Sequence, residues 1–164
     1  GLVLGRDLPV GITVPTPGAM QALGVELAGL LRAGDVIIAT GGLGAGKTTL
    51  AQGIGEGLRV EGPVSSPTFV LSRTHPSAGA GPSLVHVDAY RMTDAGELAD
   101  IDLDATLPEA VTLVEWGEGL AEWLSEDRLE IDIDRQAGDD ARYVTLTGVG
   151  PRWAGALEPL RRQP

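Results

Sequence analysis

The stretch GGLGAGKTTL, residues 41–50, constrains the fold of this chain more than any other part of the sequence. It contains the pattern G-x-x-x-x-G-K-[ST], which four residues fulfil: Gly41, Gly46, Lys47 and Thr48. Glycines allow successive backbone N–H groups to turn toward the phosphate oxygens of a nucleotide, and the N-terminus of a helix adds its dipole. The pattern needs a strand before the loop and a helix after it, so it predicts an α/β fold with a nucleotide site at this junction.

Lys47 is the only lysine in a chain whose other basic residues are all arginine. A compact ammonium on a flexible stem can reach between the β- and γ-phosphates, where a planar guanidinium would be bulkier and differently directed. Thr48 places a hydroxyl where Mg²⁺ takes a protein oxygen ligand. We therefore expect a phosphate loop that binds ATP or ADP and consists of Gly41, Gly42, Leu43, Gly44, Ala45, Gly46, Lys47, Thr48 and Thr49.

The pattern of apolar residues on both sides of the phosphate loop agrees with this context. Thr16 and Pro17 followed by an apolar stripe predict a helix that ends before Gly34, and a second helix is predicted from Lys47 onward. Other predicted elements are strands at 36–39, 68–72, 84–87, 111–114, 129–134 and 143–147, a loop at 75–83, helical pieces at 95–107 and 119–124, and a turn at 138–140. The expected fold is one P-loop NTPase-like domain, residues 1–164, built as a three-layer α/β sandwich with a mainly parallel central sheet and an antiparallel C-terminal edge.

Phosphoryl transfer in such a fold needs a carboxylate at the end of a strand beside the loop, to hold Mg²⁺ directly or through water. Two apolar strands end in acids, LVHVD at Asp88 and VTLVE at Glu115, and the sequence alone does not rank them. Thr68 is a third candidate, because a loop after the first helix of the site can carry a hydroxyl toward the γ-phosphate. His86 shares a strand face with Asp88 by alternation and fits a packed histidine, or one that supports a ligand, better than a general base.

Composition and charge exclude several other classes of protein. The chain has no cysteine, which excludes disulfides, thiolate zinc sites and cysteine nucleophiles. No apolar run approaches the roughly 20 residues of a membrane-spanning helix, and no leader pattern is visible, so a cytoplasmic location is expected. The formal net charge of −11 disfavours direct gripping of nucleic acid. The acids concentrated between residues 88 and 140 form either a solvated surface or a docking face for a basic partner.

Four stretches in this order, GGLGAGKTTL, SSPTFV, HVDAYRM and LVEW, resemble the TsaE (YjeE) family of small bacterial P-loop ATPases. The later IDID strand resembles the C-terminal part of that family more loosely. Two positions depart from the family pattern: Gly42 stands where an acid is frequent, and Gly117 where proline often follows LVEW. Neither departure removes a phosphate or metal ligand.

The resemblance implies a role in the biosynthesis of threonylcarbamoyladenosine in tRNA. It implies ATP binding and slow hydrolysis in support of a complex of TsaB and TsaD, which modifies adenosine 37 of tRNA, so that contact with tRNA is indirect. It also implies that Thr48 and Glu115 hold Mg²⁺, that Thr68 lies in a switch-like segment, and that Asp88 sits at the active site. Trp116 would lie beside Glu115.

Combining both lines of reasoning, we expect a Mg²⁺-dependent ATPase with Lys47, Asp88, Glu115 and Thr68 as catalytic residues. Lys47 and Mg²⁺ would stabilise charge on the transferring phosphoryl group, and Asp88 or Thr68 would position water or sense the γ-phosphate. Since no arginine finger stands out, turnover by the isolated chain should be slow. The first alternative is a small-molecule kinase with residues 73–83 as its lid, and the second is an assembly module that binds ATP without hydrolysing it.

Overall fold

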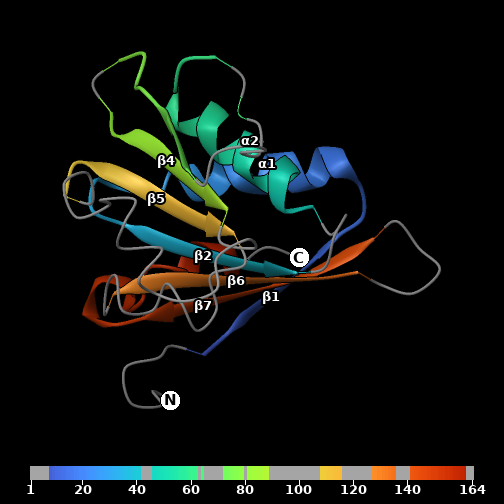
Figure 1. Ribbon diagram of the computed structural model, residues 1–164. Coiled ribbons are helices and arrows are strands. Elements are labelled where there is room, and N and C mark those ends of the chain that lie inside the picture. Colours follow the sequence, from blue (N-terminus) through green and yellow to red (C-terminus); the bar gives the residue numbers. More distant parts are fainter. Residues whose placement is uncertain are drawn as a thin grey trace.

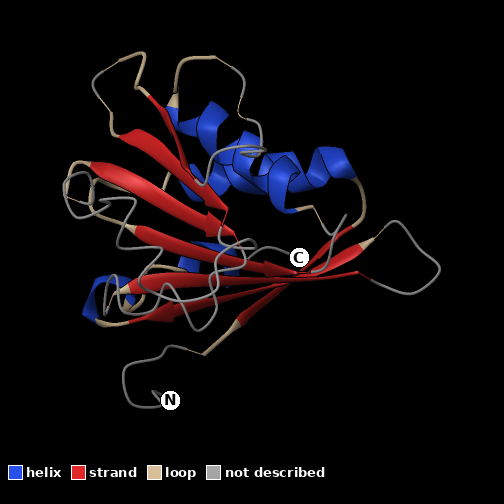
Figure 2. Ribbon diagram, viewed as in Figure 1, coloured by secondary structure: helices blue, strands red, loops and turns tan. Residues whose placement is uncertain are grey.

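The computed structural model describes residues 8–41, 46–62, 64, 72–79, 81–88, 108–115, 127–135 and 141–161, and within these residues the strands form one seven-stranded sheet (Figures 1 and 2). The strands are β1 (Val10–Val14), β2 (Val36–Gly41), β3 (Ser72–His75), β4 (Ser83–Asp88), β5 (Ala110–Glu115), β6 (Arg128–Arg135) and β7 (Arg142–Val149). The described helices are α1 (Pro17–Ala28), α2 (Lys47–Leu58), a 3₁₀ turn η3 (Pro151–Trp153) and a short α4 (Glu158–Arg161).

The sheet has the order β1-β7-β6-β2-β5-β4-β3. The four central strands β6, β2, β5 and β4 pair in parallel, while β3 on one edge and β7 and β1 on the other pair antiparallel. This confirms the predicted α/β class with a parallel core and an antiparallel C-terminal edge. That edge begins at β7 rather than at β6, because β6 pairs in parallel with β2 before the chain turns back.

Helix α1 starts where the sequence predicts, because Thr16 caps it and Pro17 occupies its first turn. The Thr16 hydroxyl oxygen accepts a hydrogen bond of 3.0 Å from the backbone N–H of Ala19. Helices α1 and α2 lie side by side against the sheet in Figure 1. Small residues allow this close approach: a Cβ atom at Gly53 would lie 2.1 Å from the carbonyl oxygen of Gln21, and one at Gly24 would lie 2.5 Å from that of Leu50.

The main core lies between the sheet and these helices. Its sheet side includes Ile37 and Leu113 from the parallel strands, and Ile131 and Leu146 from β6 and β7. Strands β2 and β5 are buried along most of their length, as expected for parallel strands with both faces covered, whereas β6 and β7 alternate buried with more exposed residues. No helix within the described residues is long and apolar enough to cross a membrane.

The C-terminal segment is tied to the core by one residue with several partners. Arg152 donates two hydrogen bonds of 2.9 Å to the two carboxylate oxygens of Asp35 and a third, of 2.7 Å, to the carbonyl oxygen of Leu30. Its guanidinium also lies 4.3 Å from the ring centre of Trp153, which is fully buried. These contacts fix η3 against the turn that leads into β2 and therefore support the strand that carries the phosphate loop.

Several elements differ from the sequence-based prediction. The pattern analysis missed β1, η3 and α4. Of the strand predicted at 68–72, residues 68–71 lie outside the described residues, and the described strand β3 runs from Ser72 to His75. The loop predicted at 75–83 is correspondingly shorter, since its first and last residues belong to β3 and β4. The helical pieces predicted at 95–107 and 119–124 and the turn at 138–140 lie outside the described residues.

Candidate functional site

The site is built around the junction between β2 and α2, in the strand–loop–helix context that the phosphate-loop pattern requires. Strand β2 ends at Gly41 and α2 begins at Lys47. Gly46 precedes the helix in a left-handed conformation, with φ of 116°, which a residue with a side chain rarely adopts. Residues 42–45, predicted to cradle phosphate, lie outside the described residues. The backbone therefore carries the geometry that the glycine at position 46 predicts.

Lys47 is buried at the start of α2, where only 7% of the residue is exposed. Its Nζ donates a hydrogen bond of 2.6 Å to the carbonyl oxygen of Gly41, the last residue of β2. Burial lowers the pKa of Lys47 from its ordinary value of 10.5, while the charges of Glu115 and Asp88 act in the opposite direction and raise it. The ammonium group of Lys47 therefore interacts electrostatically with both carboxylates.

The two candidate acids meet at the same edge of the sheet. Asp88 and Glu115 are register partners on the neighbouring parallel strands β4 and β5, and Ala39 of β2 is the register partner of Glu115 on the other side. They differ in environment, because Glu115 is 4% exposed while Asp88 is half-buried. The structure thus brings together Lys47, Asp88 and Glu115, which the sequence placed at separate motifs.

Glu115 also contacts a histidine on the neighbouring strand β4. Its carboxylate oxygen Oε2 lies 2.7 Å from Nε2 of His86, and the side chains of both residues are almost completely shielded from solvent. His86 lies on β4, two residues before Asp88, so alternation places both side chains on the same face of the sheet. The contact fits the sequence-based interpretation of His86 as a packed or supporting residue rather than a general base.

The oxygen donors at this junction suit a magnesium ion bound with a nucleotide. Thr48 and Thr49 lie half-buried in the first turn of α2. The Thr48 hydroxyl and the Glu115 carboxylate are the protein oxygens that the family resemblance assigns to the ion. Within the described residues no group of three or more His, Cys, Asp or Glu could hold a metal on its own. Mg²⁺ commonly takes one or two protein oxygens together with substrate phosphates and water, so this sparse donor set fits it.

Thr68 and Trp116, which the sequence analysis singled out, lie outside the described residues, and so do Gly42, Leu43, Gly44 and Ala45 of the phosphate loop.

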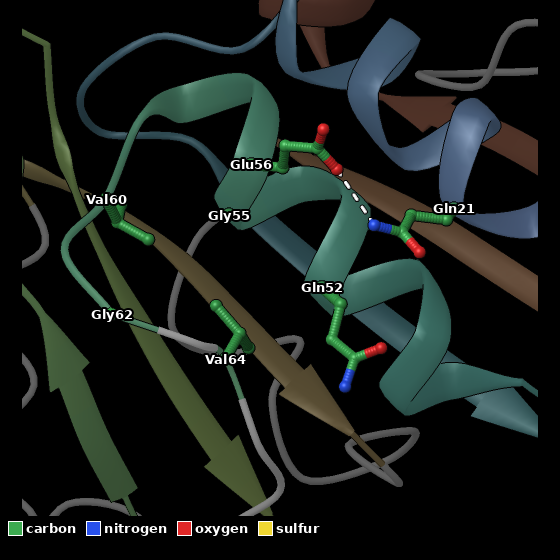
Figure 3. Close-up of a pocket in the computed structure, with 7 residues that line it drawn as sticks. All are labelled: Gln21, Gln52, Gly55, Glu56, Val60, Gly62 and Val64. Atoms are coloured by element: carbon green, nitrogen blue, oxygen red, sulfur yellow. Dashed lines mark hydrogen bonds between the residues drawn. The ribbon is translucent and has the colours of Figure 1, made fainter.

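A separate pocket that the sequence did not reveal lies along the second half of α2 (Figure 3). It has a volume of about 440 Å³, and a hydrogen bond of 2.8 Å from the Gln21 side-chain amide to Glu56 joins two of the residues that line it. On α2, the residues that line the pocket begin at Gln52, which is five residues after Lys47, or about 7 Å along the helix. The phosphate-binding end of α2 is therefore not part of this pocket. Its lining residues are Gln21, Gln52, Gly55, Glu56, Val60, Gly62 and Val64.

A family model described as "Threonylcarbamoyl adenosine biosynthesis protein TsaE" matches residues 14–144, which span both the phosphate loop and the two acids. A protein from Streptomyces coelicolor named tRNA threonylcarbamoyladenosine biosynthesis protein TsaE is 59% identical over 141 residues, covering 84% of this chain and 95% of the relative. A protein of the same name from Mycobacterium tuberculosis is 47% identical over 140 residues, covering 81% of this chain and 83% of the relative.

The fold has a solved counterpart. The crystal structure of YdiB from Bacillus subtilis superposes with a TM-score of 0.74 at 34% sequence identity, covering 94% of this chain and 95% of that one. The shared architecture therefore extends beyond the phosphate loop to nearly the whole length of both chains.

Proposed function

The chain belongs to the TsaE family, which serves the biosynthesis of threonylcarbamoyladenosine in tRNA, and from this we propose that it acts there as a slow, partner-stimulated, Mg²⁺-dependent ATPase. The observation that best supports the proposal is the meeting of three charged groups beside the phosphate loop. Lys47 starts α2, and its pKa responds to both Glu115 and Asp88, which are register partners on β5 and β4. A lysine facing two carboxylates at a helix N-terminus suits a nucleotide bound with a divalent cation.

Each residue has a distinct part in this proposal. When a nucleotide binds, Lys47 donates hydrogen bonds to the phosphates, either in place of its bond to Gly41 or in addition to it. Its positive charge stabilises the negative charge that develops on the phosphoryl oxygens. Thr48 and Glu115 would hold Mg²⁺, which when bound neutralises phosphate charge and orients the γ-phosphoryl group. The burial of Glu115 strengthens its electrostatic interactions because little water screens them.

Asp88 and Thr68 complete the proposed catalytic set. Asp88 is half-buried beside Glu115, so its carboxylate can interact both with the site and with solvent. We assign it, or Thr68, the positioning of the attacking water or the sensing of the γ-phosphate. The water attacks phosphorus as the bond to the leaving ADP oxygen breaks, which gives ADP and inorganic phosphate.

The proposed partners are TsaB and TsaD. The net charge of −11 favours contact with tRNA through those proteins rather than directly, because a surface rich in carboxylates repels the phosphate backbone. An arginine or other stabilising group supplied by the complex would raise turnover above that of the isolated chain. We place this activity in the cytoplasm, where tRNA is modified.

The test is to measure Mg²⁺-dependent ATP hydrolysis by the purified chain, alone and with TsaB, TsaD and tRNA. We expect slow hydrolysis that rises when the partners are added and that disappears when EDTA removes Mg²⁺. If the rate of ATP hydrolysis does not change when the partners are added, and a small-molecule phosphate acceptor increases it, the chain is instead a kinase. Nucleotide binding without hydrolysis in every mixture would identify an assembly module.

A further inference from the structure

Glu115 is fixed at the sheet edge by a contact with a residue on the neighbouring strand, and this contact calls for an explanation. A glutamate side chain has several rotatable bonds, so placing its carboxylate in one orientation costs conformational entropy unless a neighbour fixes it. Glu115 has such a neighbour in His86, whose Nε2 lies 2.7 Å from Oε2 of the carboxylate. Because the contact joins side chains of adjacent strands, it fixes Glu115 relative to β4 as well as to β5.

His86 is placed in the core at an energetic cost that packing alone does not explain. The residue has no exposed surface, and its register neighbour on β5 is the apolar Leu113. Its second ring nitrogen, Nδ1, is buried and has no hydrogen-bond partner within the described part of the chain. An apolar side chain would avoid the cost of burying this nitrogen unpaired. The polar interaction that the ring does make is the one with Glu115.

The surroundings of His86 do not suit a general base. Full burial separates the ring from solvent, and Nε2 is already bonded to Glu115, so His86 is poorly placed to take a proton from an attacking water. A carboxylate that binds Mg²⁺ only accepts hydrogen bonds, so in this contact the proton lies on Nε2 and His86 is the donor.

We propose that His86 is a positioning residue, which donates its Nε2 proton to Glu115 Oε2 and so orients the carboxylate for binding Mg²⁺. This inference rests on the proposed function, since it assumes that Glu115 binds the ion that accompanies the nucleotide. Groups that orient a metal ligand commonly change metal affinity or activity by about 10- to 100-fold when they are removed.

The test compares three variants of the full chain. His86→Leu removes the donor, while His86→Gln retains a side-chain N–H that can reach Glu115. His75→Leu is the matched control, because His75 is also buried but lies on the edge strand β3, which pairs with β4 and not with β5, the strand that carries Glu115. The readout is binding rather than turnover: the Mg²⁺ concentration that half-saturates the ADP complex is measured by calorimetry, and Mn²⁺ binding to that complex is measured by electron paramagnetic resonance.

We expect His86→Leu to raise the required Mg²⁺ concentration by at least about tenfold, with ADP affinity in EDTA unchanged. His86→Gln should recover most of the loss, and His75→Leu should behave like the wild type. Equal Mg²⁺ and Mn²⁺ dependence in the wild type and folded His86→Leu would overturn the inference while leaving the proposed function intact. Absence of ADP binding by the wild type would overturn the proposed function itself.

If His86→Leu does not fold, His86→Asn provides the same contrast with His86→Gln, because its shorter amide does not reach Glu115. The positioning role then requires weaker Mn²⁺ binding in the asparagine variant than in the glutamine variant. Indistinguishable Mn²⁺ binding by these two folded variants would refute the role.

Discussion

The Nζ atom of Lys47 lies 2.6 Å from the carbonyl oxygen of Gly41 and joins the first residue of α2 to the last residue of β2. The bond therefore joins the two ends of the segment that connects β2 to α2. It holds a buried ammonium group whose pKa is lowered by burial and raised by the charges of Glu115 and Asp88. A dianionic or more highly charged phosphate group would offset the burial of this cation, so the proposed nucleotide binding would centre on Lys47.

Replacing Lys47 by alanine should weaken ATP binding by about 10- to 100-fold, because a charge-assisted hydrogen bond contributes about 1.5–3 kcal/mol. Isothermal titration calorimetry in the presence of Mg²⁺ measures this loss, and the thermal unfolding midpoint of the variant shows whether it is folded. An unchanged affinity in a folded variant would contradict the assignment of residues 41–49 as the phosphate loop.

Thr48→Val should affect only the part of nucleotide binding that depends on Mg²⁺, since valine keeps the shape of threonine and removes the hydroxyl. The affinity for ADP is measured with Mg²⁺ and again with EDTA. We expect a loss of about tenfold with Mg²⁺ and none with EDTA, as for removal of one metal ligand or its support. An equal loss under both conditions would instead assign the hydroxyl to a phosphate contact or to the helix start.

Gly53→Ala should destabilise the fold by about 1–3 kcal/mol, because its Cβ would lie 2.1 Å from the carbonyl oxygen of Gln21 and push α1 and α2 apart. Gly18→Ala is the matched control in α1: its nearest neighbour would be the Thr16 hydroxyl at 3.8 Å, and alanine favours a helix over glycine. Urea unfolding compares the two variants. Similar stability for both would show that the close helix contact contributes little.

The free energy of unfolding should decrease in mild acid because of the buried side chain of His75. Burial lowers the pKa of His75 below its ordinary value of 6.5, and the neighbouring His86 and Arg73 act in the same direction. The unfolded chain therefore takes up a proton near pH 6.5 that the folded chain resists, so the free energy of unfolding is greatest above that pH and decreases below it. His75→Leu removes this group and should lose less stability between about pH 7.5 and about pH 5.5 in urea unfolding. Equal losses in both proteins would contradict this origin of the pH dependence.

Much of the site could be predicted from the sequence because its parts are local patterns. The phosphate-loop pattern fixed the strand–loop–helix order, and two apolar runs that end in Asp88 and Glu115 placed both acids at the carboxyl edge. The different environments of the two acids were not predictable from local patterns, because they depend on burial and on a contact between His86 and Glu115, residues 29 positions apart. Local patterns carry no information on such a pair.

The other differences between the predicted and the observed elements have two kinds of explanation, an overlooked local pattern and a dependence on tertiary contacts. Strand β1 carries a signal that could have revealed it, since Val10, Ile12 and Val14 alternate with Gly11 and Thr13. Strand β3 is polar throughout and is defined by its pairing with β4, and η3 depends on the contacts of Arg152 with the distant residue Asp35. Tertiary contacts rather than local propensity determine both.

The central claim, that ATP hydrolysis by this chain sustains the modification of tRNA, is tested most directly with the Glu115→Gln variant. The measurement is threonylcarbamoylation of tRNA over many turnovers by TsaB and TsaD. ATP is supplied at concentrations that, by calorimetry, saturate both the wild-type chain and the variant. We predict that wild-type protein sustains repeated turnover, whereas Glu115→Gln binds ATP but stops supporting turnover once the first complexes have formed. Sustained turnover with the variant at the wild-type rate would contradict the account and identify ATP as a ligand that only stabilises assembly.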